Sequence, residues 1–135
     1  MRGELTFGES FVKKRAEDQV AGVPGLVKRR LDILPEGNTN WHVVTQYHYT
    51  AWPQQNLQDG FKHIWELCRI VKTNLIRNRG PCVVHCSDSI GRTGFFIAAM
   101  KLMDEVDQTR ENIDIFNTVF QMRAARMKMV SVIEI

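Results

Sequence analysis

Cys86 and Arg92 are the residues of this chain whose types and spacing most clearly indicate chemistry. They lie in the sequence VVHCSDSIGRTGFF, residues 83–96, with five residues between them. Five residues can wrap the backbone around one tetrahedral oxyanion with successive N–H groups pointing inward. The planar guanidinium of Arg92 could bind two oxygens of that anion. The same positive field lowers the pKa of a cysteine, so Cys86 is a candidate thiolate nucleophile for phosphoryl transfer.

Neighbouring residues are expected to support this loop. Gly91 and Gly94 permit a tight turn, and the helix that follows directs its positive end toward the anion. Thr93 could donate a hydrogen bond to the sulfur, and His85 either orients the loop or is a buried neutral histidine. We expect the phosphate to be held by six consecutive residues: Ser87, Asp88, Ser89, Ile90, Gly91 and Arg92. The alternative, a small buried cysteine followed by a surface arginine, explains this ordered pattern less well.

The elements expected to position the loop begin with strands. Residues 5–14 and 26–34 read as short strands broken by Gly and Pro, and residues 35–40 form a turn. Residues 41–50 are a clearer strand, rich in β-branched and aromatic residues. A helix with Asp59 as its N-cap follows. Apolar residues at helical spacing should bury one face of this helix: Phe61, Ile64, Trp65, Cys68, Val71 and Leu75.

The second half of the chain predicts one more strand and two helices. Residues 78–86 indicate a turn and then a buried strand that ends at Cys86, and a helix runs from Thr93 with residues 94–103 as its apolar body. The last helix begins near Asn112 or Asp114. Its inner stripe is expected to be Ile115, Phe116, Val119 and Phe120, and its C-terminal end is basic, with Arg123, Arg126 and Lys128. The order predicts an α/β fold, in which ligands bind beyond the carboxyl ends of the strands.

Length and composition predict one compact domain over residues 1–135. No apolar run is long enough to insert into a membrane and the start lacks a signal peptide, so we expect a cytoplasmic protein. The net charge of +3 arises partly from two basic clusters, residues 13–15 and 28–30. These are interpreted as structural, with acidic or phosphorylated partners as the weaker alternative, and no nucleic-acid binding is expected.

The three cysteines indicate a reducing compartment, because their odd number and spacing favour neither a disulfide framework nor a zinc site. We expect no metal and no cofactor. Cys68 is assigned to helix packing and Cys82 to the core, with a disulfide between Cys82 and Cys86 as a minor alternative. The oligomeric state is not predicted.

These motifs resemble the cysteine-dependent protein tyrosine phosphatases, whose loop usually reads H-C-S-A-G-I-G-R-[ST]-G. Residues 47–53, YHYTAWP, resemble the family's Y-x-x-W-P-D segment, and residues 114–130 resemble its last helix with the M-R-x-x-R turn. The Cys-x5-Arg loop also occurs in dual-specificity phosphatases, but the Trp52-Pro53 segment favours the tyrosine-specific branch. The chain further resembles the divergent phosphatase-like proteins of polydnaviruses (bracoviruses), which would place it in the cytoplasm of a host cell.

The resemblance implies a partial protein-tyrosine-phosphatase fold: a twisted mixed sheet flanked by helices, with the Cys-x5-Arg loop between a strand end and a helix N-terminus. It implies that Cys86 is the nucleophile, Arg92 the phosphate clamp and Thr93 a donor to the thiolate, with Trp52 and Pro53 as a hinge. Arg123 and Arg126 match basic positions of the family, and they either contact the loop or only favour the helix end.

Three departures from the family pattern predict impaired catalysis. Gln54 stands where the family has the aspartic acid that protonates the leaving group, and an amide has no such proton to give. Asp88 and Ser89 replace the usual Ala and Gly, which weakens the loop through like charge and, if residue 89 is left-handed, through strain. The match begins partway through the family's domain, and Ser131 and Ile135 stand where its water-directing glutamines are expected, so substrate recognition and hydrolysis of the intermediate both lose residues. The missing strands leave part of the sheet unpaired, so we expect marginal stability or a partner.

Three functions remain open from the sequence. The favoured one is a phosphatase-like protein with impaired catalysis that binds phosphotyrosine-containing proteins and modulates tyrosine-phosphorylation signalling. The second is an active but slow phosphatase that forms a thiophosphate intermediate on Cys86. The third is a vestigial product of a partial gene, with neither binding nor catalysis.

Overall fold

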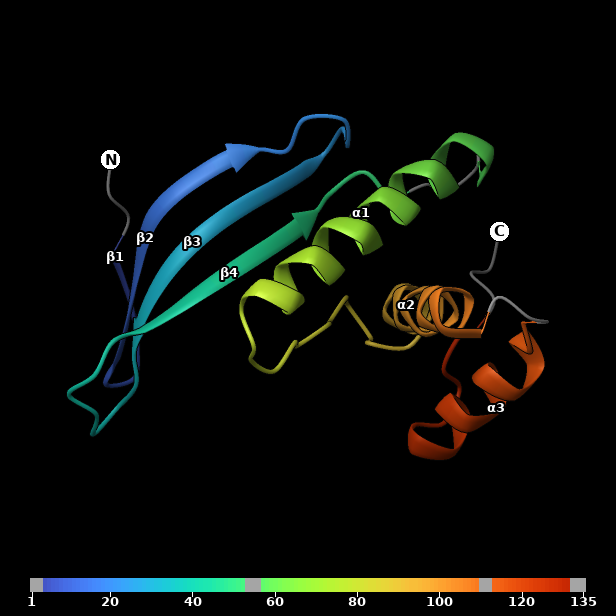
Figure 1. The fold of residues 1–135 in the computed structure, drawn as a ribbon. Coiled ribbons are helices and arrows are strands. Elements are labelled where there is room, and N and C mark those ends of the chain that lie inside the picture. Colours follow the sequence, from blue (N-terminus) through green and yellow to red (C-terminus); the bar gives the residue numbers. More distant parts are fainter. Residues whose placement is uncertain (1–3, 53–56, 110–112, 132–135) are drawn as a thin grey trace. The chain divides into compact units, whose positions relative to one another are not determined.

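The computed structural model describes residues 4–52, 57–109 and 113–131, and the side chains within them except those of residues 57–59 and 109. The chain divides into two compact units, residues 1–53 and residues 54–135. The described residues of the first form a β-sheet, and those of the second form three helices (Figure 1). Each unit is described by itself.

The first unit is a four-stranded antiparallel sheet in the order β1-β2-β3-β4. Its strands are β1 (Glu4–Phe7), β2 (Ser10–Gln19), β3 (Leu26–Leu34) and β4 (His42–Tyr49). Each strand pairs with the next one along the chain, so the sheet is a meander of hairpins (Figure 1). The expectation of a mixed sheet is therefore wrong, because short connections between consecutive strands allow only antiparallel pairing.

The expected strand over residues 5–14 is in fact a hairpin. Gly8 has a φ of +60°, which reverses the chain between β1 and β2 at low steric cost. The strand over residues 26–34 is confirmed as β3, and that over residues 41–50 is confirmed as β4 with slightly narrower bounds. The turn at 35–40 is confirmed by a hydrogen bond from Asn38 N–H to the Pro35 carbonyl, 3.1 Å.

The basic clusters of the sheet are largely ion-paired across its strands. Arg15 lies 2.5 Å from the buried carboxylate of Asp32, and Arg29 pairs with Glu17. Lys14 also reaches Glu17, at 3.2 Å, within β2. The two pairs between strands support the structural interpretation of the clusters, since opposite charges on neighbouring strands stabilise the ladder modestly.

The second unit contains α1 (Leu57–Arg77), α2 (Gly91–Thr109) and α3 (Ile115–Ala125), and α2 packs against both other helices. Helix α1 begins two residues before Asp59, so Asp59 is not its N-cap. Its buried face holds Ile64, Leu67, Cys68 and Val71, whereas Phe61 and Trp65 are about half exposed, contrary to the expected stripe. Helix α2 begins at Gly91 rather than Thr93.

Helix α3 turns a different face inward from the one expected. Asp114 is its N-cap and accepts a hydrogen bond from Asn117 N–H at 2.8 Å, which confirms the start. Its buried residues are Thr118 and Met122, while Phe116 is 81% and Phe120 64% exposed. The Thr118 hydroxyl donates to Glu105 of α2, 3.2 Å. The apolar pattern therefore predicted the wrong inner face for α3, because the buried face includes a polar residue with a hydrogen-bond partner.

The buried strand expected before Cys86 is absent from the described part of the second unit. Residues 81–86 are irregular, and Val83 is 84% exposed. A strand requires hydrogen bonds from a neighbouring strand, and the described residues of this unit contain no strand. The loop thus follows an irregular segment instead of a strand end. None of the helices in the described ranges has both the length and the apolarity that crossing a bilayer requires.

Candidate functional site: the Cys86–Arg92 loop

The loop lies directly before helix α2. Residues 87–90 bend sharply, and α2 begins at Gly91. Ser89 has a φ of +56°, so the left-handed conformation considered for this position is confirmed. A serine in this region costs about 1–2 kcal/mol relative to the right-handed region. The bend brings the backbone N–H of Ile90 to 2.9 Å from Oδ1 of Asp88.

The thiol of Cys86 is half-buried and hydrogen-bonded. Its Sγ donates to Oδ1 of Asp88 at 3.2 Å. Burial and this bond to Asp88 raise the pKa of the thiol, but the hydroxyl and backbone N–H of Thr93 lower it, and the net pKa is below its ordinary value. A lowered pKa increases the thiolate fraction near neutral pH, which is the form that attacks phosphorus.

Thr93 lies in the first turn of α2 and is buried, with 4% of its surface exposed. Its Oγ1 has no partner of full hydrogen-bond geometry among the described residues, yet it lies close enough to the Cys86 sulfur to lower the thiol pKa. A buried hydroxyl without a strong acceptor costs free energy. A thiolate at Cys86 would accept this bond fully.

Asp88 turns its carboxylate into the loop. Hydrogen bonds from the N–H of Ile90, from the Cys86 thiol and from the N–H of Gly91 lower the pKa of this carboxyl group. From the sequence, we expect this carboxylate to weaken phosphate binding by like charge. The structure places that charge in direct contact with the candidate nucleophile.

Arg92 and His85 are both exposed. Neither side chain makes a hydrogen bond or an ion pair with any residue in the described ranges. The guanidinium is thus available to a ligand, and its role as clamp stays a prediction. The alternative of a buried histidine at position 85 is wrong, and the supporting role of His85 stays a prediction too.

The upstream candidates belong to the other unit or lie outside the described residues. Trp52 is half-buried, and its ring meets that of Tyr49 edge-on with centroids 6.3 Å apart. Pro53 and Gln54 lie outside the described residues. The structure therefore does not test the acid position.

A turn at the C-terminal end of the described chain braces the loop from outside. Val130 N–H donates to the Ile90 carbonyl at 3.2 Å, and the same carbonyl accepts from Gly94 N–H at 3.0 Å. A Cβ added at Gly94 would lie 2.5 Å from the Val130 nitrogen, so this close approach requires glycine. Val130 itself has a φ of +56°, which is rare for a β-branched residue.

Arg123 and Arg126, near the end of α3, each donate a hydrogen bond to the backbone of the loop or of this turn. Arg126 donates from Nη2 to the Asp88 carbonyl at 3.2 Å, which favours contact with the loop over a purely helical role. Arg123 donates from Nε to the Met129 carbonyl at 2.9 Å and holds the turn. Helix α3 ends at Ala125, so Arg126 and Lys128 lie beyond its last turn, contrary to expectation. Sequence analysis did not predict this turn, because Lys128 and Val130 have positive φ, which lysine and valine rarely adopt.

The other two cysteines differ from each other. Cys68 is fully buried, which confirms its packing role, and burial raises the pKa of its thiol to about 12. Cys82 is exposed, so its assignment to the core is wrong, and no disulfide forms. The segment around Cys82 is irregular and packs little, which explains the exposure. Within the described ranges, no three His, Cys, Asp or Glu side chains are grouped closely enough to hold a metal ion.

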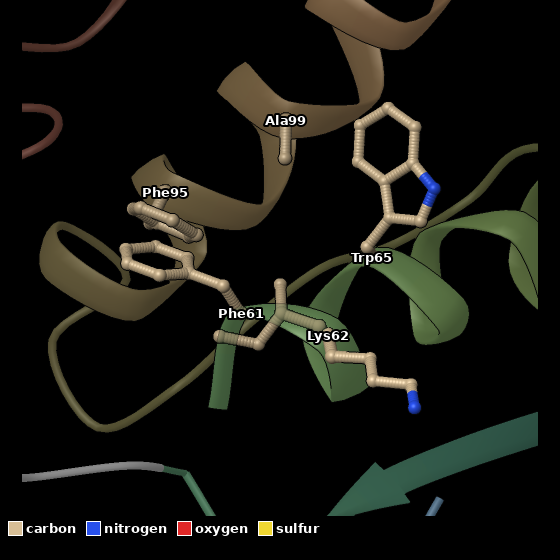
Figure 2. A pocket seen from close by; sticks show the side chains of 6 residues that line it. Phe61, Lys62, Trp65, Phe95 and Ala99 are labelled. Atoms are coloured by element: carbon tan, nitrogen blue, oxygen red, sulfur yellow. The ribbon is translucent and has the colours of Figure 1, made fainter. Parts of the chain in front are cut away.

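An apolar pocket of about 360 Å³ lies between α1 and α2 (Figure 2). Phe61 and Phe95 face each other across it with ring centroids 5.6 Å apart. Its other lining residues are Lys62, Ile64, Trp65 and Ala99. No lining residue belongs to the loop from Cys86 to Arg92, so this pocket is separate from the chemistry of the thiol.

The chain belongs to the protein-tyrosine phosphatase family, whose pattern matches residues 1–134. It is 31% identical over 124 residues to the rat phosphatidylinositol phosphatase PTPRQ, covering 92% of this chain and 5% of that protein. It is 34% identical over 97 residues to the rat receptor-type tyrosine-protein phosphatase epsilon, covering 72% of this chain and 14% of that protein. The mouse epsilon protein matches equally. The chain thus spans only 5 to 14% of the length of these relatives.

These relatives are receptor-type or phosphatidylinositol phosphatases of mammals. The narrower resemblance to polydnavirus proteins gains no support from them. The comparisons therefore establish the family of the chain.

Proposed function

We propose that this chain binds phosphotyrosine-containing proteins through the loop from Cys86 to Arg92 and hydrolyses them poorly. The observation that carries the proposal is the loop at the start of α2, in which the pKa of the Cys86 thiol is lowered and Arg92 is exposed with no partner among the described residues. Backbone N–H groups at a helix N-terminus and the exposed guanidinium of Arg92 suit a phosphate dianion, and the lowered thiol pKa supplies the nucleophile. Bound phosphoproteins would be shielded from other phosphatases.

The first chemical step would be attack of the Cys86 thiolate on phosphorus. An S–P bond forms, the P–O bond to tyrosine breaks, and the electron pair leaves with the phenolate oxygen. Arg92 would bind the oxygens of the transferring group. A phenol is a poor leaving group unless an acid protonates it, and Gln54 occupies the acid position of the family. Loss of a general acid slows such a step by about 10²–10⁴-fold, roughly 3–5 kcal/mol of barrier.

An active but slow phosphatase is the second candidate. It is favoured by the same lowered pKa of Cys86, since a larger thiolate fraction near neutral pH supports attack on phosphorus. This candidate predicts that an activated aryl phosphate, whose leaving group needs no proton, is cleaved far faster than phosphotyrosine. The two candidates share the loop and differ in whether the intermediate forms and turns over.

The substrate class of the relatives suggests one further ligand. The protein 31% identical to this chain is a phosphatidylinositol phosphatase by name, so an inositol phosphate headgroup is an alternative to phosphotyrosine. The same loop would bind either phosphate monoester. Titration with a soluble inositol phosphate beside a phosphotyrosine peptide distinguishes the two.

The experiment is calorimetric titration of the chain with a phosphotyrosine peptide, repeated for Arg92→Ala and for a control, Arg79→Ala. Arg79 is an exposed residue of the irregular segment after α1, with no charge partner among described residues. We expect binding by the unsubstituted chain and the control, and a loss of about tenfold or more in Arg92→Ala, because a charged hydrogen-bonding partner is removed. Equal affinities in all three proteins would refute the loop as the binding site.

A further inference from the structure

We infer that the Asp88 carboxylate occupies the oxyanion position of the Cys86–Arg92 loop, so that the loop carries its own anion, which an incoming phosphate must displace. The inference rests on the proposed function, because it concerns the same loop. It assigns to Asp88 the role of an internal competitor that sets how tightly phosphate esters bind.

One carboxylate oxygen of Asp88 uses two of the groups that a bound phosphate would need. Oδ1 accepts the backbone N–H of Ile90 at 2.9 Å and the thiol of Cys86 at 3.2 Å. The first is a loop N–H that would point at the anion, and the second is the candidate nucleophile. An oxyanion seated in the loop would occupy the same place, and two anions cannot share it.

The backbone of the loop holds Asp88 in this position. The left-handed turn at Ser89, with a φ of +56°, directs the Ile90 N–H back toward Asp88. From the C-terminal turn, Arg126 donates to the Asp88 carbonyl at 3.2 Å. Both contacts restrain the backbone of Asp88, while its side chain is exposed and free to rotate outward. The carboxylate can therefore leave without unfolding the loop.

Phosphate binding is weakened because the Asp88 carboxylate must lose its own hydrogen bonds when the phosphate displaces it. A hydrogen bond between a backbone donor and an ionised acceptor is stronger than a neutral one, and its loss corresponds to about tenfold or more in affinity. The displaced charge also stays near the phosphate and repels it. Arg92, which has no partner among the described residues, is the group that would favour the incoming dianion over the carboxylate.

The test is calorimetric titration of the full chain with tungstate, a tetrahedral oxyanion that has no leaving group. Asp88→Ala and Asp88→Asn are compared with the unsubstituted chain and with Asp107→Asn. Asp107 lies on α2 and pairs with Lys72, so the control removes the same charge from an exposed carboxylate of the same unit. We expect Asp88→Ala to bind tungstate about tenfold or more tightly than the unsubstituted chain, with Asp88→Asn between them and the control within twofold.

A second signature separates this role from a general effect of charge. Oδ1 of Asp88 also accepts the Ile90 N–H just before α2, so Asp88→Ala, which loses this bond, should melt at a lower temperature while it binds tungstate more tightly. If Asp88→Ala does not fold, carbon-13 NMR of the unsubstituted chain replaces it. The side-chain carboxyl resonance of Asp88 and the amide of Ile90 should then shift together as tungstate is added.

Unchanged tungstate affinity in Asp88→Ala, or an Asp88 carboxyl resonance that stays fixed at saturating tungstate, would overturn the inference. Neither result would contradict the proposed function if peptide binding still depends on Arg92. Conversely, tighter tungstate binding by Asp88→Ala together with peptide binding that ignores Arg92 would support the competitor and refute phosphotyrosine recognition by the loop. Failure of every variant to bind tungstate would overturn both.

Discussion

At the scale of single residues, the state of the Cys86 thiol results from opposing neighbours. Burial and the carboxylate of Asp88 favour the neutral thiol, and the hydroxyl and N–H of Thr93 favour the thiolate. The pKa lies below its ordinary value because Thr93 prevails. Two side chains within seven residues of Cys86 thus have opposite effects on its reactivity.

Thr93→Val should raise the pKa of Cys86 toward its ordinary value, because the substitution removes the hydroxyl that stabilises the thiolate. The thiolate fraction at pH 7 falls, and we expect alkylation of Cys86 by iodoacetamide to slow by about threefold to tenfold. The rate is measured on the Cys86 peptide by mass spectrometry across pH 6–9, since Cys82 is also exposed. The profile should shift to higher pH.

Thr73→Val is the matched control for this substitution. The Thr73 hydroxyl donates to the Arg69 carbonyl within α1 at 2.9 Å and is remote in sequence from the loop. Its loss should leave the alkylation profile of Cys86 unchanged. A profile that does not move in Thr93→Val would contradict the role assigned to Thr93.

The chemistry of the loop could largely be predicted from residue types, whereas its internal contacts could not. Cys86, Thr93 and the conformation of Ser89 follow from spacing and from the rule that left-handed backbone favours glycine. The inward orientation of the Asp88 side chain depends on which backbone N–H groups lack partners, and a sequence alone does not show which these are. The sequence therefore predicted a repelling charge but not a competing ligand.

At the scale of elements, the loop is held between the start of α2 and the turn after α3. The Ile90 carbonyl accepts from both Gly94 and Val130, so the two segments share one acceptor. Gly94 makes this possible because it has no side chain at the contact. The geometry of the loop therefore depends on residues well outside it in the sequence.

Gly94→Ala should destabilise the chain by about 1–3 kcal/mol, although alanine is the better helix former. The new Cβ would lie 2.5 Å from the backbone nitrogen of Val130, and that backbone cannot easily move. Urea unfolding followed by circular dichroism measures the change. Gly80→Ala is the control, because a Cβ at Gly80 would meet nothing within 4 Å. Equal stability of the two variants would contradict this close packing.

Helix α3 offers a second test at the same scale, since its aromatic face is exposed. Met122→Ala should cost about 2–4 kcal/mol, because Met122 is buried against Ala98 and Met129. Phe116→Ala should change stability by no more than about 0.5 kcal/mol, because Phe116 is 81% exposed. The free energies of unfolding in urea decide between this face and the one that the sequence predicted. A larger loss of stability in Phe116→Ala than in Met122→Ala would favour the buried face that the sequence predicted.

The elements that sequence analysis predicted well are those whose stability is local. Strand β3 and the N-cap of α3 follow from composition and from one capping side chain. The strand predicted at residues 81–86 is absent because pairing with a neighbouring strand cannot be predicted from a single segment. The buried face of α3 was predicted wrongly because the Thr118 hydroxyl has a hydrogen-bond partner, Glu105, on another helix. Both errors concern contacts between distant segments.

At the scale of the whole molecule, the chain matches the family pattern but departs from it at the position of the general acid. The family pattern covers residues 1–134, which include the Cys86–Arg92 loop. Gln54 at the acid position supports weak turnover. The predicted single domain over residues 1–135 stays a prediction, since its two compact units are each described alone.

Gln54→Asp should raise the turnover of a phosphotyrosine peptide, because a carboxylic acid can protonate the leaving phenol. We expect an increase of about 10²-fold or more, with little change for an activated aryl phosphate. Gln55→Asp is the matched control, since it adds the same charge one residue later. An equal effect of Gln54→Asp on both substrates would contradict the missing acid as the cause of slow turnover.

The most direct test of the account is a single titration of the unsubstituted chain with a phosphotyrosine peptide, in which heat and released phosphate are recorded together. We expect saturable heat near one peptide per chain, with less than one phosphate released per chain over the same period. Many phosphates released per chain, or no saturable heat at all, would contradict it.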